Sequence, residues 1–222
     1  MNSNYKVIKF RSNNSKEVND QISIEEPLQI ILKYKDKENW IENTISVTMR
    51  TPGDDEDLVA GFLFNERVIE KISHIENIEA SGEAVGQYKL QNKVIVTINN
   101  SENIDIDKIK RNFLTNSSCG VCGKTSLESL EIIKKDKILK SIPKIPHEII
   151  MKSPDILRKN QSEFSKTGGI HASGLFNANG EIIALKEDVG RHNALDKLIG
   201  FVLKENLLDN SSQFLTCSGR LN

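Results

Sequence analysis

Residues 168–203 read GGIHASGLFNANGEIIALKEDVGRHNALDKLIGFVL, and they carry the clearest secondary-structure signals in the chain. Apolar and β-branched residues predict two strands, at 169–176 and 181–185. The segment Asn177–Gly180 between them is typical of a hairpin turn. Apolar residues then recur at helical spacing from Ala194 to Leu203. Strands that alternate with a helix predict an α/β fold, with a mixed sheet and flanking helices.

The remainder of the chain shows the same mixture of strand and helix signals. Pro52 at a first helical position and the acidic residues after it predict a helix that buries Leu58, Val59, Phe62 and Leu63. We also expect strands at 28–34, 45–49, 88–98 and 214–217, and helices at 105–113, 126–134 and within 148–164, the last interrupted near Pro154.

Two further expectations concern the organisation of the chain. Residues 11–20 are polar, and we interpret them as a mobile turn. We divide the chain into an N-terminal α/β subdomain, residues 1–115, and a second unit, residues 116–222.

The composition limits the class of protein. The chain has 222 residues and a formal net charge of -1, with 37% hydrophobic and 27% charged residues, which is typical of a globular protein. This balance argues against a nucleic-acid partner, which would favour a strongly basic face. No apolar run approaches the roughly 20 residues that span a bilayer, and the N-terminus lacks an apolar signal-peptide core. We therefore expect a cytoplasmic protein without a membrane partner.

A glycine-containing loop at residues 116–124 carries two cysteines, Cys119 and Cys122. Thr125 and Glu128 form a capping-box pattern, which predicts that a helix begins there. The free amides of that helix and the adjacent Lys124 both favour a thiolate over a thiol. A thiolate is the species that attacks a persulfide donor and accepts sulfur.

Four interpretations of this cysteine pair compete. A structural zinc site needs four ligands, and the sequence offers only Cys217 and scattered histidines as further candidates, so we predict no bound metal. A thioredoxin-type dithiol would follow a strand, and the preceding residues 113–116 predict only a weak one. An inert buried pair is the third interpretation. The surrounding glycines and Lys124 favour the fourth, which is sulfur carriage or thiol catalysis.

A second polar cluster comprises Thr167–Ala172 and Glu187–Lys197. We interpret 187–193 as a polar loop before the helix, with Asn193 or Asp188 as its cap. Free amides together with Arg191 and His192 could hold an anion such as a phosphate or pyrophosphate.

The same cluster has a plainer interpretation. It is also consistent with an ordinary capped helix with an Arg–Glu ion pair, and with His171 as a semi-buried strand residue. The density of polar residues and the Gly168–Gly169 pair favour a site, to which Arg220 could add an anion contact.

These motifs together resemble the FdhD family of sulfur carrier proteins. The resemblance covers nearly the whole chain, and the run EDVGRHNALDK is its most specific part. The matching segments are, in order, Thr51–Asp54 with Leu58 and Gly61–Leu63, then Ser118–Gly123, Thr167–Ala172, Glu187–Lys197 and Ser218–Arg220.

The resemblance implies a cytidine-deaminase-like α/β core, a cytoplasmic location and a homodimer. It also implies a sulfurtransferase that receives sulfur from a cysteine desulfurase on Cys119, with Cys122 as its partner. The sulfur would pass to the molybdenum cofactor, in its bis-guanine-dinucleotide form, before insertion into formate dehydrogenase. The cofactor-binding residues would be Gly168, Gly169, His171, Gly190, Arg191, His192, Asn193 and Arg220.

Two alternatives accompany this implied function. A non-catalytic chaperone that only binds the molybdenum cofactor would not need its cysteines. A zinc-dependent hydrolase of the deaminase type would need a proline before Cys119, where the sequence has Ser118.

The chain departs from the family in three places. Glu66 is followed by Arg67 where the family usually has glycine, which we expect to affect a helix end or a turn. The family continues beyond the Ser218–Arg220 motif into a segment with a cofactor-binding motif, so we expect the deaminase-like core to be incomplete here. Cys217 lies beside that motif, and we interpret it as a buried small hydrophobic residue.

Overall fold

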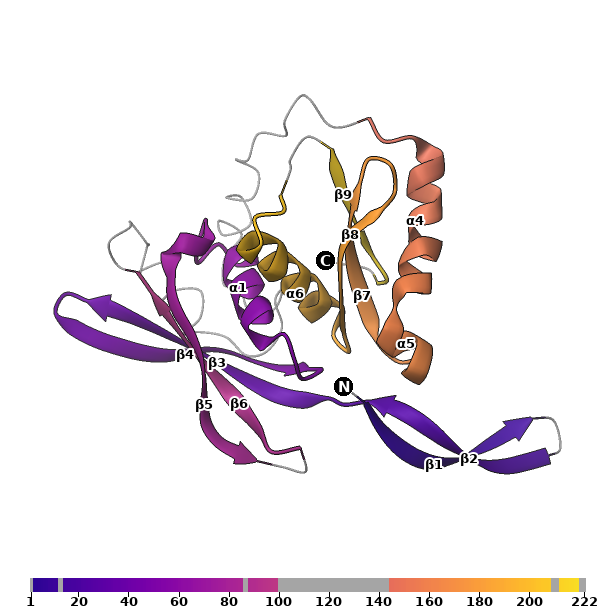
Figure 1. Ribbon diagram of the computed structural model, residues 1–222. Coiled ribbons are helices and arrows are strands. Elements are labelled where there is room, and N and C mark those ends of the chain that lie inside the picture. The colour runs from indigo at the N-terminus through magenta and orange to yellow at the C-terminus, as the bar shows by residue number, and fades with distance from the viewer. Residues whose placement is uncertain (1, 12–13, 86–87, 100–143, 209–211, 220–222) are drawn as a thin grey trace, which may run out of the picture.

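The computed structural model describes residues 2–11, 14–85, 88–99, 144–208 and 212–219 (Figure 1). Several predictions lie outside these residues and remain predictions. They concern the helices at 105–113 and 126–134, the boundary between residues 115 and 116, and the site residues Cys119, Cys122 and Arg220.

A four-stranded mixed sheet forms one outer layer of the fold. Its strand order is β4-β3-β6-β5, in which β3 and β6 are parallel and the other neighbours are antiparallel. The strands are β3 (Glu26–Asp36), β4 (Asn39–Arg50), β5 (Ile75–Val85) and β6 (Leu90–Ile98). Helix α1 (Asp55–Asn65) covers one face of this sheet (Figure 1).

Alternation along β3 supplies the core of this first half. Leu28, Ile30, Leu32 and Tyr34 point to the same face of the sheet and are fully buried. They pack in one hydrophobic cluster with α1, which contributes Leu58, Val59 and Leu63. The helix predicted after Pro52 is thus present with these three side chains buried. It begins at Asp55, so Pro52 lies in the preceding turn and not at a first helical position.

A three-stranded antiparallel sheet forms the second half, in the order β8-β7-β9. Its strands are β7 (His171–Asn177), β8 (Ile182–Asp188) and β9 (Gln213–Cys217). The predicted hairpin turn is confirmed, since the Gly180 amide donates to the Asn177 carbonyl at 3.0 Å. Figure 1 shows α6 (Arg191–Lys204) on one side of this sheet and α4 (His147–Asn160) with α5 (Ser162–Thr167) on the other.

Helices α1 and α6 lie between the two sheets and contact each other through their backbones at Gly61 and Gly200. A Cβ atom on Gly61 would stand 2.8 Å from the Gly200 nitrogen and still closer to the Asp196 carbonyl. A Cβ atom on Gly200 would likewise stand 2.8 Å from the Gly61 nitrogen and closer to the Asp57 carbonyl. Only glycine therefore fits at either position of this crossing.

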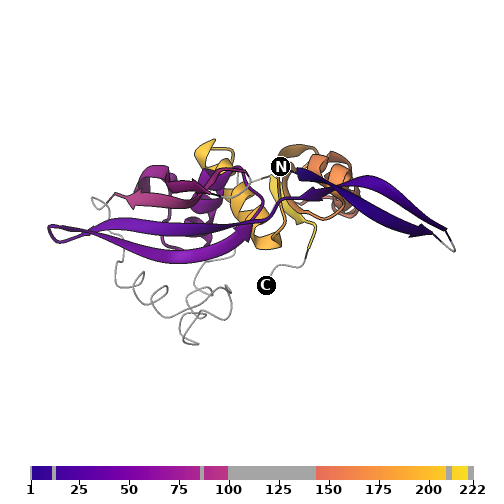
Figure 2. The same ribbon diagram turned by 90° about the horizontal axis from the view of Figure 1, so that it is seen from below.

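Strands β1 (Asn2–Arg11) and β2 (Asn14–Ser23) form a separate antiparallel hairpin. The prediction of a mobile turn at 11–20 is therefore wrong, because 14–23 pair along their whole length with β1. Figures 1 and 2 show the hairpin projecting from the rest of the molecule. Its base is joined to α5 by side-chain hydrogen bonds, from Ser23 to Thr167 at 2.8 Å and from Asn2 to Glu163 at 3.0 Å.

Pro154 does not interrupt α4, contrary to the sequence prediction, and the helix runs from His147 to Asn160. A proline has no amide hydrogen to donate to the carbonyl four residues earlier, which here belongs to Ile150. The hydroxyl of Ser153 donates to that carbonyl at 2.8 Å and replaces the missing bond. The helical segment instead ends near Gln161, between α4 and α5.

Arg67 occupies the position at which the family usually has glycine, and its backbone explains that preference. The residue has a φ of 57°, in the left-handed region. Its amide donates to the Phe64 carbonyl at 2.9 Å, and the Val68 amide donates to the Leu63 carbonyl at 2.8 Å. These two bonds form a Schellman motif that ends α1, with arginine at the position that glycine adopts most readily.

Cys217 ends β9 and is half-buried, so the interpretation as a fully buried residue is only partly correct. Its sulfur accepts a hydrogen bond from the Ser173 hydroxyl at 3.3 Å.

Mixed sheets with flanking helices confirm the predicted α/β class. Strand β5 was missed, because its polar sequence IENIEASGEAV has few apolar residues. In the described part of the chain, no helix combines the length and apolar character that a membrane crossing requires.

The helix crossing leads to a stability prediction. Gly61→Ala should lower the free energy of unfolding by about 2 kcal/mol or more, because the added methyl group must push the two backbones apart. Urea denaturation would measure the loss. Gly169→Ala is the matched control, since the nearest heavy atom to a Cβ there is 4.0 Å away. Equal stability of the two variants would contradict the proposed role of the crossing.

Candidate functional site

The loops before α1 and α6 are joined by Thr51 and Asp188. Asp188 ends β8 and is fully buried. One of its oxygens, Oδ2, accepts a hydrogen bond from the Thr51 amide at 3.0 Å. The Thr51 hydroxyl in turn accepts from the Val189 amide at 3.1 Å. Two motifs separated by more than 130 residues in sequence therefore meet at this point.

Lys197 and Asn193 complete this contact. The Lys197 ammonium lies 2.7 Å from both Asp188 Oδ2 and the Thr51 carbonyl, and the residue is 1% exposed. The Asn193 amide donates to the Met49 carbonyl at 2.6 Å and to Asp188 Oδ1 at 3.2 Å. We call Thr51, Asp188, Asn193 and Lys197 the junction network.

The junction network changes the interpretation of the EDVGRHNALDK run. Helix α6 begins at Arg191 and β8 ends at Asp188, so the predicted polar loop at 187–193 is much too long. Gly190 is the N-cap residue, and no side chain caps this helix end, which corrects the prediction for Asn193 and Asp188. Both side chains instead hold the two halves of the fold together.

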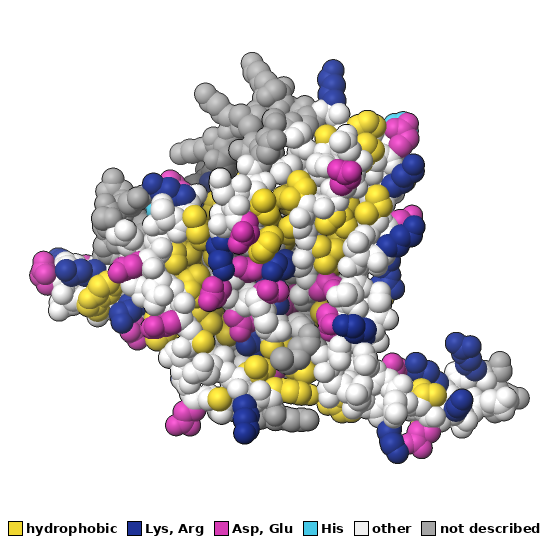
Figure 3. All heavy atoms as spheres, viewed as in Figure 1, with side chains coloured by type: hydrophobic (Ala, Val, Ile, Leu, Met, Phe, Trp, Pro, Cys, Tyr) yellow, Lys and Arg dark blue, Asp and Glu magenta, His cyan; other side chains and the backbone are white. Residues whose placement is uncertain are grey.

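Surface ion pairs reinforce the same junction. Lys186 on β8 lies 2.9 Å from carboxylate oxygens of both Asp54 and Asp57. Lys204 on α6 lies 3.0 Å from a second oxygen of Asp57 and 3.1 Å from Glu56. Figure 3 shows acidic and basic side chains interspersed over the middle of this face. Acidic residues in the first turn of α1, which also suit the helix dipole, therefore pair with lysines from the other half.

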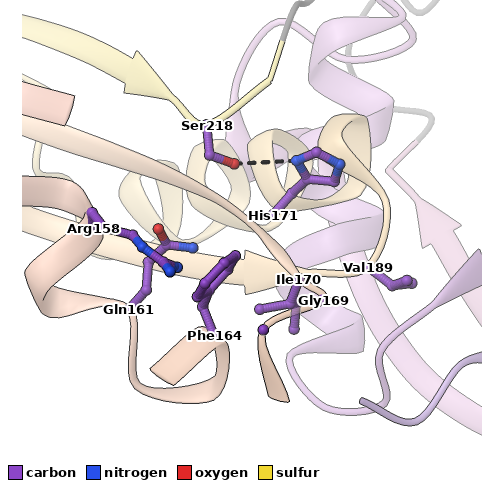
Figure 4. Close-up of a pocket in the computed structure, with 9 residues that line it drawn as sticks. Arg158, Gln161, Phe164, Gly169, Ile170, His171, Val189 and Ser218 are labelled. Atoms are coloured by element: carbon purple, nitrogen blue, oxygen red, sulfur yellow. Dashed lines mark hydrogen bonds between the residues drawn. The ribbon is translucent and has the colours of Figure 1, made fainter. Parts of the chain in front are cut away.

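A cavity of about 630 Å³ opens on the second half of the fold, where α5 meets the start of β7 (Figure 4). Of the predicted cofactor-binding residues, Gly168, Gly169 and His171 line it. The lining residues are Arg158, Gln161, Phe164, Gly168, Gly169, Ile170, His171, Val189 and Ser218.

Gly168 and His171 are positioned by the ends of two elements. Gly168 follows α5 with a φ of 69°, and its amide donates to the Phe164 carbonyl at 2.7 Å. This left-handed conformation suits glycine and turns the chain into the cavity wall. His171 begins β7, and its Nδ1 lies 3.2 Å from the Ser218 hydroxyl (Figure 4).

The Ser218–Gly219 segment is held against His171. The Ser218 hydroxyl accepts a hydrogen bond from the Ala172 amide at 2.9 Å, and the Ser218 amide donates to the Ala172 carbonyl at 2.9 Å. A Cβ atom on Gly219 would stand 3.2 Å from the imidazole ring and 3.4 Å from the Arg191 Cβ. The glycine thus lets this segment pass between His171 and the start of α6.

Gly190, Arg191, His192 and Asn193 were also predicted to bind the cofactor, but they do not line the cavity. The Gly190 amide donates to Asp188 Oδ1 at 2.8 Å. Arg191 and His192 are exposed in the first turn of α6. Partial burial of the imidazole, together with the positive charge of Arg191, lowers the pKa of His192. That histidine is therefore neutral at pH 7.

Sequence reasoning missed Arg158, Gln161 and Phe164 as lining residues. They fall in the segment 148–164, for which the sequence predicted only a helix interrupted near Pro154. The break between α4 and α5 turns these side chains towards β7. No residue in the segment predicts that break. The Glu187 carboxylate fixes the break, because it accepts hydrogen bonds from the Glu163 and Phe164 amides at 2.9 and 3.0 Å.

Metal ligands do not gather in the described part of the chain, where no three His, Cys, Asp or Glu side chains are close enough to share an ion. Cys119 and Cys122 lie outside that part.

Comparison with known proteins identifies one family. The FdhD/NarQ family model matches residues 23–222. The sulfur carrier protein FdhD of Picrophilus torridus is 45% identical over 204 residues, which cover 91% of this chain and 71% of that protein. The sulfur carrier protein FdhD of Saccharolobus solfataricus is 37% identical over 217 residues, which cover 98% of this chain and 76% of that protein.

A solved structure supports the same relationship. The fold is similar to a crystal structure from Desulfotalea psychrophila, assigned as a formate dehydrogenase accessory protein, with a TM-score of 0.64 and 25% sequence identity. The match covers 99% of this chain and 76% of that protein.

The buried ion pair of the junction network leads to a prediction. Lys197→Met should lower the free energy of unfolding by about 3 kcal/mol, because Asp188 would remain buried without its cation. Lys204→Met is the matched control and should lose less than about 1 kcal/mol, since Lys204 is partly exposed and Asp57 keeps Lys186 as a second cation. Urea denaturation of both variants would test this, and similar losses would contradict it.

Asp196 on α6 leads to a pH-dependent prediction. Burial, only partly offset by a hydrogen bond from Asn65, raises the pKa of Asp196 from 3.8 to about 7. Between these values the folded chain holds a proton that the unfolded chain has lost, so stability falls as the pH rises from about 4 to about 7.

Asp196→Asn removes this titration and keeps the oxygen that accepts from Asn65. The stability of the variant relative to the wild type, measured by urea denaturation, should therefore be greater at pH 8 than at pH 5. A stability difference that is the same at the two pH values would contradict the raised pKa.

Proposed function

Because the chain belongs to the FdhD/NarQ family, we propose that it is a sulfur carrier protein that holds sulfur as a persulfide on Cys119. The observation that supports this most strongly is similarity, over more than nine-tenths of the chain, to proteins named sulfur carrier protein FdhD. The family match at residues 23–222 includes both loop cysteines.

The chemistry proposed for Cys119 follows from thiol–disulfide exchange. The Cys119 thiolate attacks the outer sulfur of a persulfide on a cysteine desulfurase. A new S–S bond forms on Cys119, the donor S–S bond breaks, and the desulfurase leaves as a thiolate. No net oxidation or reduction takes place in this step.

Cys122 has a proposed role in the release of sulfur. Its thiolate attacks the inner sulfur of the Cys119 persulfide and expels the outer sulfur as sulfide for the acceptor. The two cysteines are left as a disulfide, which a cellular thiol must reduce before the next cycle.

The proposed acceptor is the molybdenum cofactor, in its bis-guanine-dinucleotide form, before insertion into formate dehydrogenase. The cavity beside β7 is the proposed binding site, because Gly168, Gly169 and His171 line it. Gly190, Arg191, His192, Asn193 and Arg220 remain proposed contributors from the adjoining segments. A homodimer in the cytoplasm is the proposed working form.

The central test concerns Cys119. After incubation with a cysteine desulfurase and cysteine, the wild type should gain the mass of one sulfur atom on the peptide that carries Cys119. Cys119→Ala should show no such gain on any peptide, and Cys217→Ala should load like the wild type. Peptide mass mapping measures all three. Full loading of Cys119→Ala would overturn the assignment.

A non-catalytic chaperone makes a different prediction. Replacement of both Cys119 and Cys122 by alanine would then leave the maturation of formate dehydrogenase intact. We expect instead that the double variant matures no active enzyme, which an activity assay in cells that depend on this chain would measure.

A further inference from the structure

Gln161 lies at the junction of α4 and α5 and is 3% exposed. Its backbone carbonyl accepts hydrogen bonds from the Ser165 amide at 3.1 Å and the Ser165 hydroxyl at 2.7 Å. Its side-chain nitrogen Nε2 is buried and has no hydrogen-bond partner in the structure as described. Buried polar groups in folded proteins nearly always have a partner, so this donor calls for an explanation.

The unpaired amide belongs to the wall of the cavity beside β7. Figure 4 shows Gln161, Arg158 and Phe164 grouped at one end of the cavity, with His171 and Ser218 at the other. The residues that line the cavity include a cation and a histidine but no carboxylate. The side chains of this wall therefore suit a ligand group that accepts hydrogen bonds and carries negative charge.

Arg158 rests on the aromatic ring of Phe164, with its guanidinium carbon 3.0 Å from the ring centroid. It projects from the exposed side of α4 and can turn without disturbing the core. Arg158 and Gln161 therefore line the same cavity, one as an exposed cation and the other as a buried donor without a partner.

We propose that Gln161 and Arg158 recognise a phosphate or pyrophosphate group of a ligand in this cavity. Gln161 Nε2 donates a hydrogen bond to a phosphate oxygen, and the Arg158 guanidinium pairs with the negative charge. This inference rests on the proposed function, in which the acceptor of sulfur is a dinucleotide cofactor with phosphate groups. The sequence predicted that site only from loops. The proposal adds two recognition residues, Arg158 on α4 and Gln161 at its C-terminal end.

Phosphate is favoured over a neutral ligand for two reasons. A neutral carbonyl would satisfy Gln161 but would leave the cation at the same end of the cavity without a counter-charge. A volume of about 630 Å³ also exceeds that of a lone phosphate and admits a nucleotide.

The test uses the full chain and two probes, inorganic pyrophosphate and guanosine diphosphate, titrated by calorimetry. Both should bind the wild type. Gln161→Met and Arg158→Met should each weaken both probes about tenfold or more, because each removes a bond to a charged group. Gln91→Met, at an exposed residue of β6 in the other sheet, is the matched control and should bind like the wild type.

A second measurement separates recognition from a structural role. Gln161→Met removes an unpaired buried donor and keeps a similar shape, so the ligand-free variant should melt at the same or a higher temperature than the wild type. A variant that melts lower and binds pyrophosphate as tightly as the wild type would show a structural role and overturn the proposal. Binding of guanosine diphosphate without binding of pyrophosphate would overturn the assignment to phosphate.

These titrations contain no desulfurase and need no sulfur on Cys119. Failure of both probes to bind a chain that loads sulfur would overturn the recognition residues alone. Failure of sulfur loading in a chain that binds both probes would overturn the carrier role alone.

Discussion

The backbone contact between α1 and α6 is the constraint on which the rest of the structure depends. Each helix covers a different sheet, and in the described part of the chain the two halves of the fold pack together where these helices meet. Gly61 and Gly200 bring the backbones so close that a single methyl group on either would collide with the opposite helix. This approach places the loop before α1 beside the loop before α6, and the polar contacts between the halves follow from it.

The junction network shows why a dense polar motif need not be a ligand site. Asp188 and Lys197 are buried together, and a buried charge is tolerated only when it is paired and hydrogen-bonded. Thr51 and Asn193 supply those hydrogen bonds with backbone and side-chain groups. Much of the EDVGRHNALDK run therefore joins the two halves, while the cavity is built from the segments on either side of it.

The cavity depends on a break in helical structure as well as on the Thr167–Ala172 motif. Glu187 accepts hydrogen bonds from the first amides of α5 and so stabilises a turn between α4 and α5. That turn places Gln161 against the start of β7, where Ser218 and Gly219 pack on His171. The cavity combines a cation with enough space for a charged ligand.

The sequence by itself determined the α/β class, the strands and hairpin turn at 169–185, the buried stripe of α1 and the family. These features depend on local periodicity, turn residues and motif order, all of which a linear chain displays. The tertiary structure alone decided that Asn193 and Asp188 join the halves, that residues 14–23 form a strand, and that Arg158 and Gln161 line the cavity. Those outcomes depend on contacts between residues that are distant in sequence. The residues adjacent in sequence do not indicate which distant residues will be in contact.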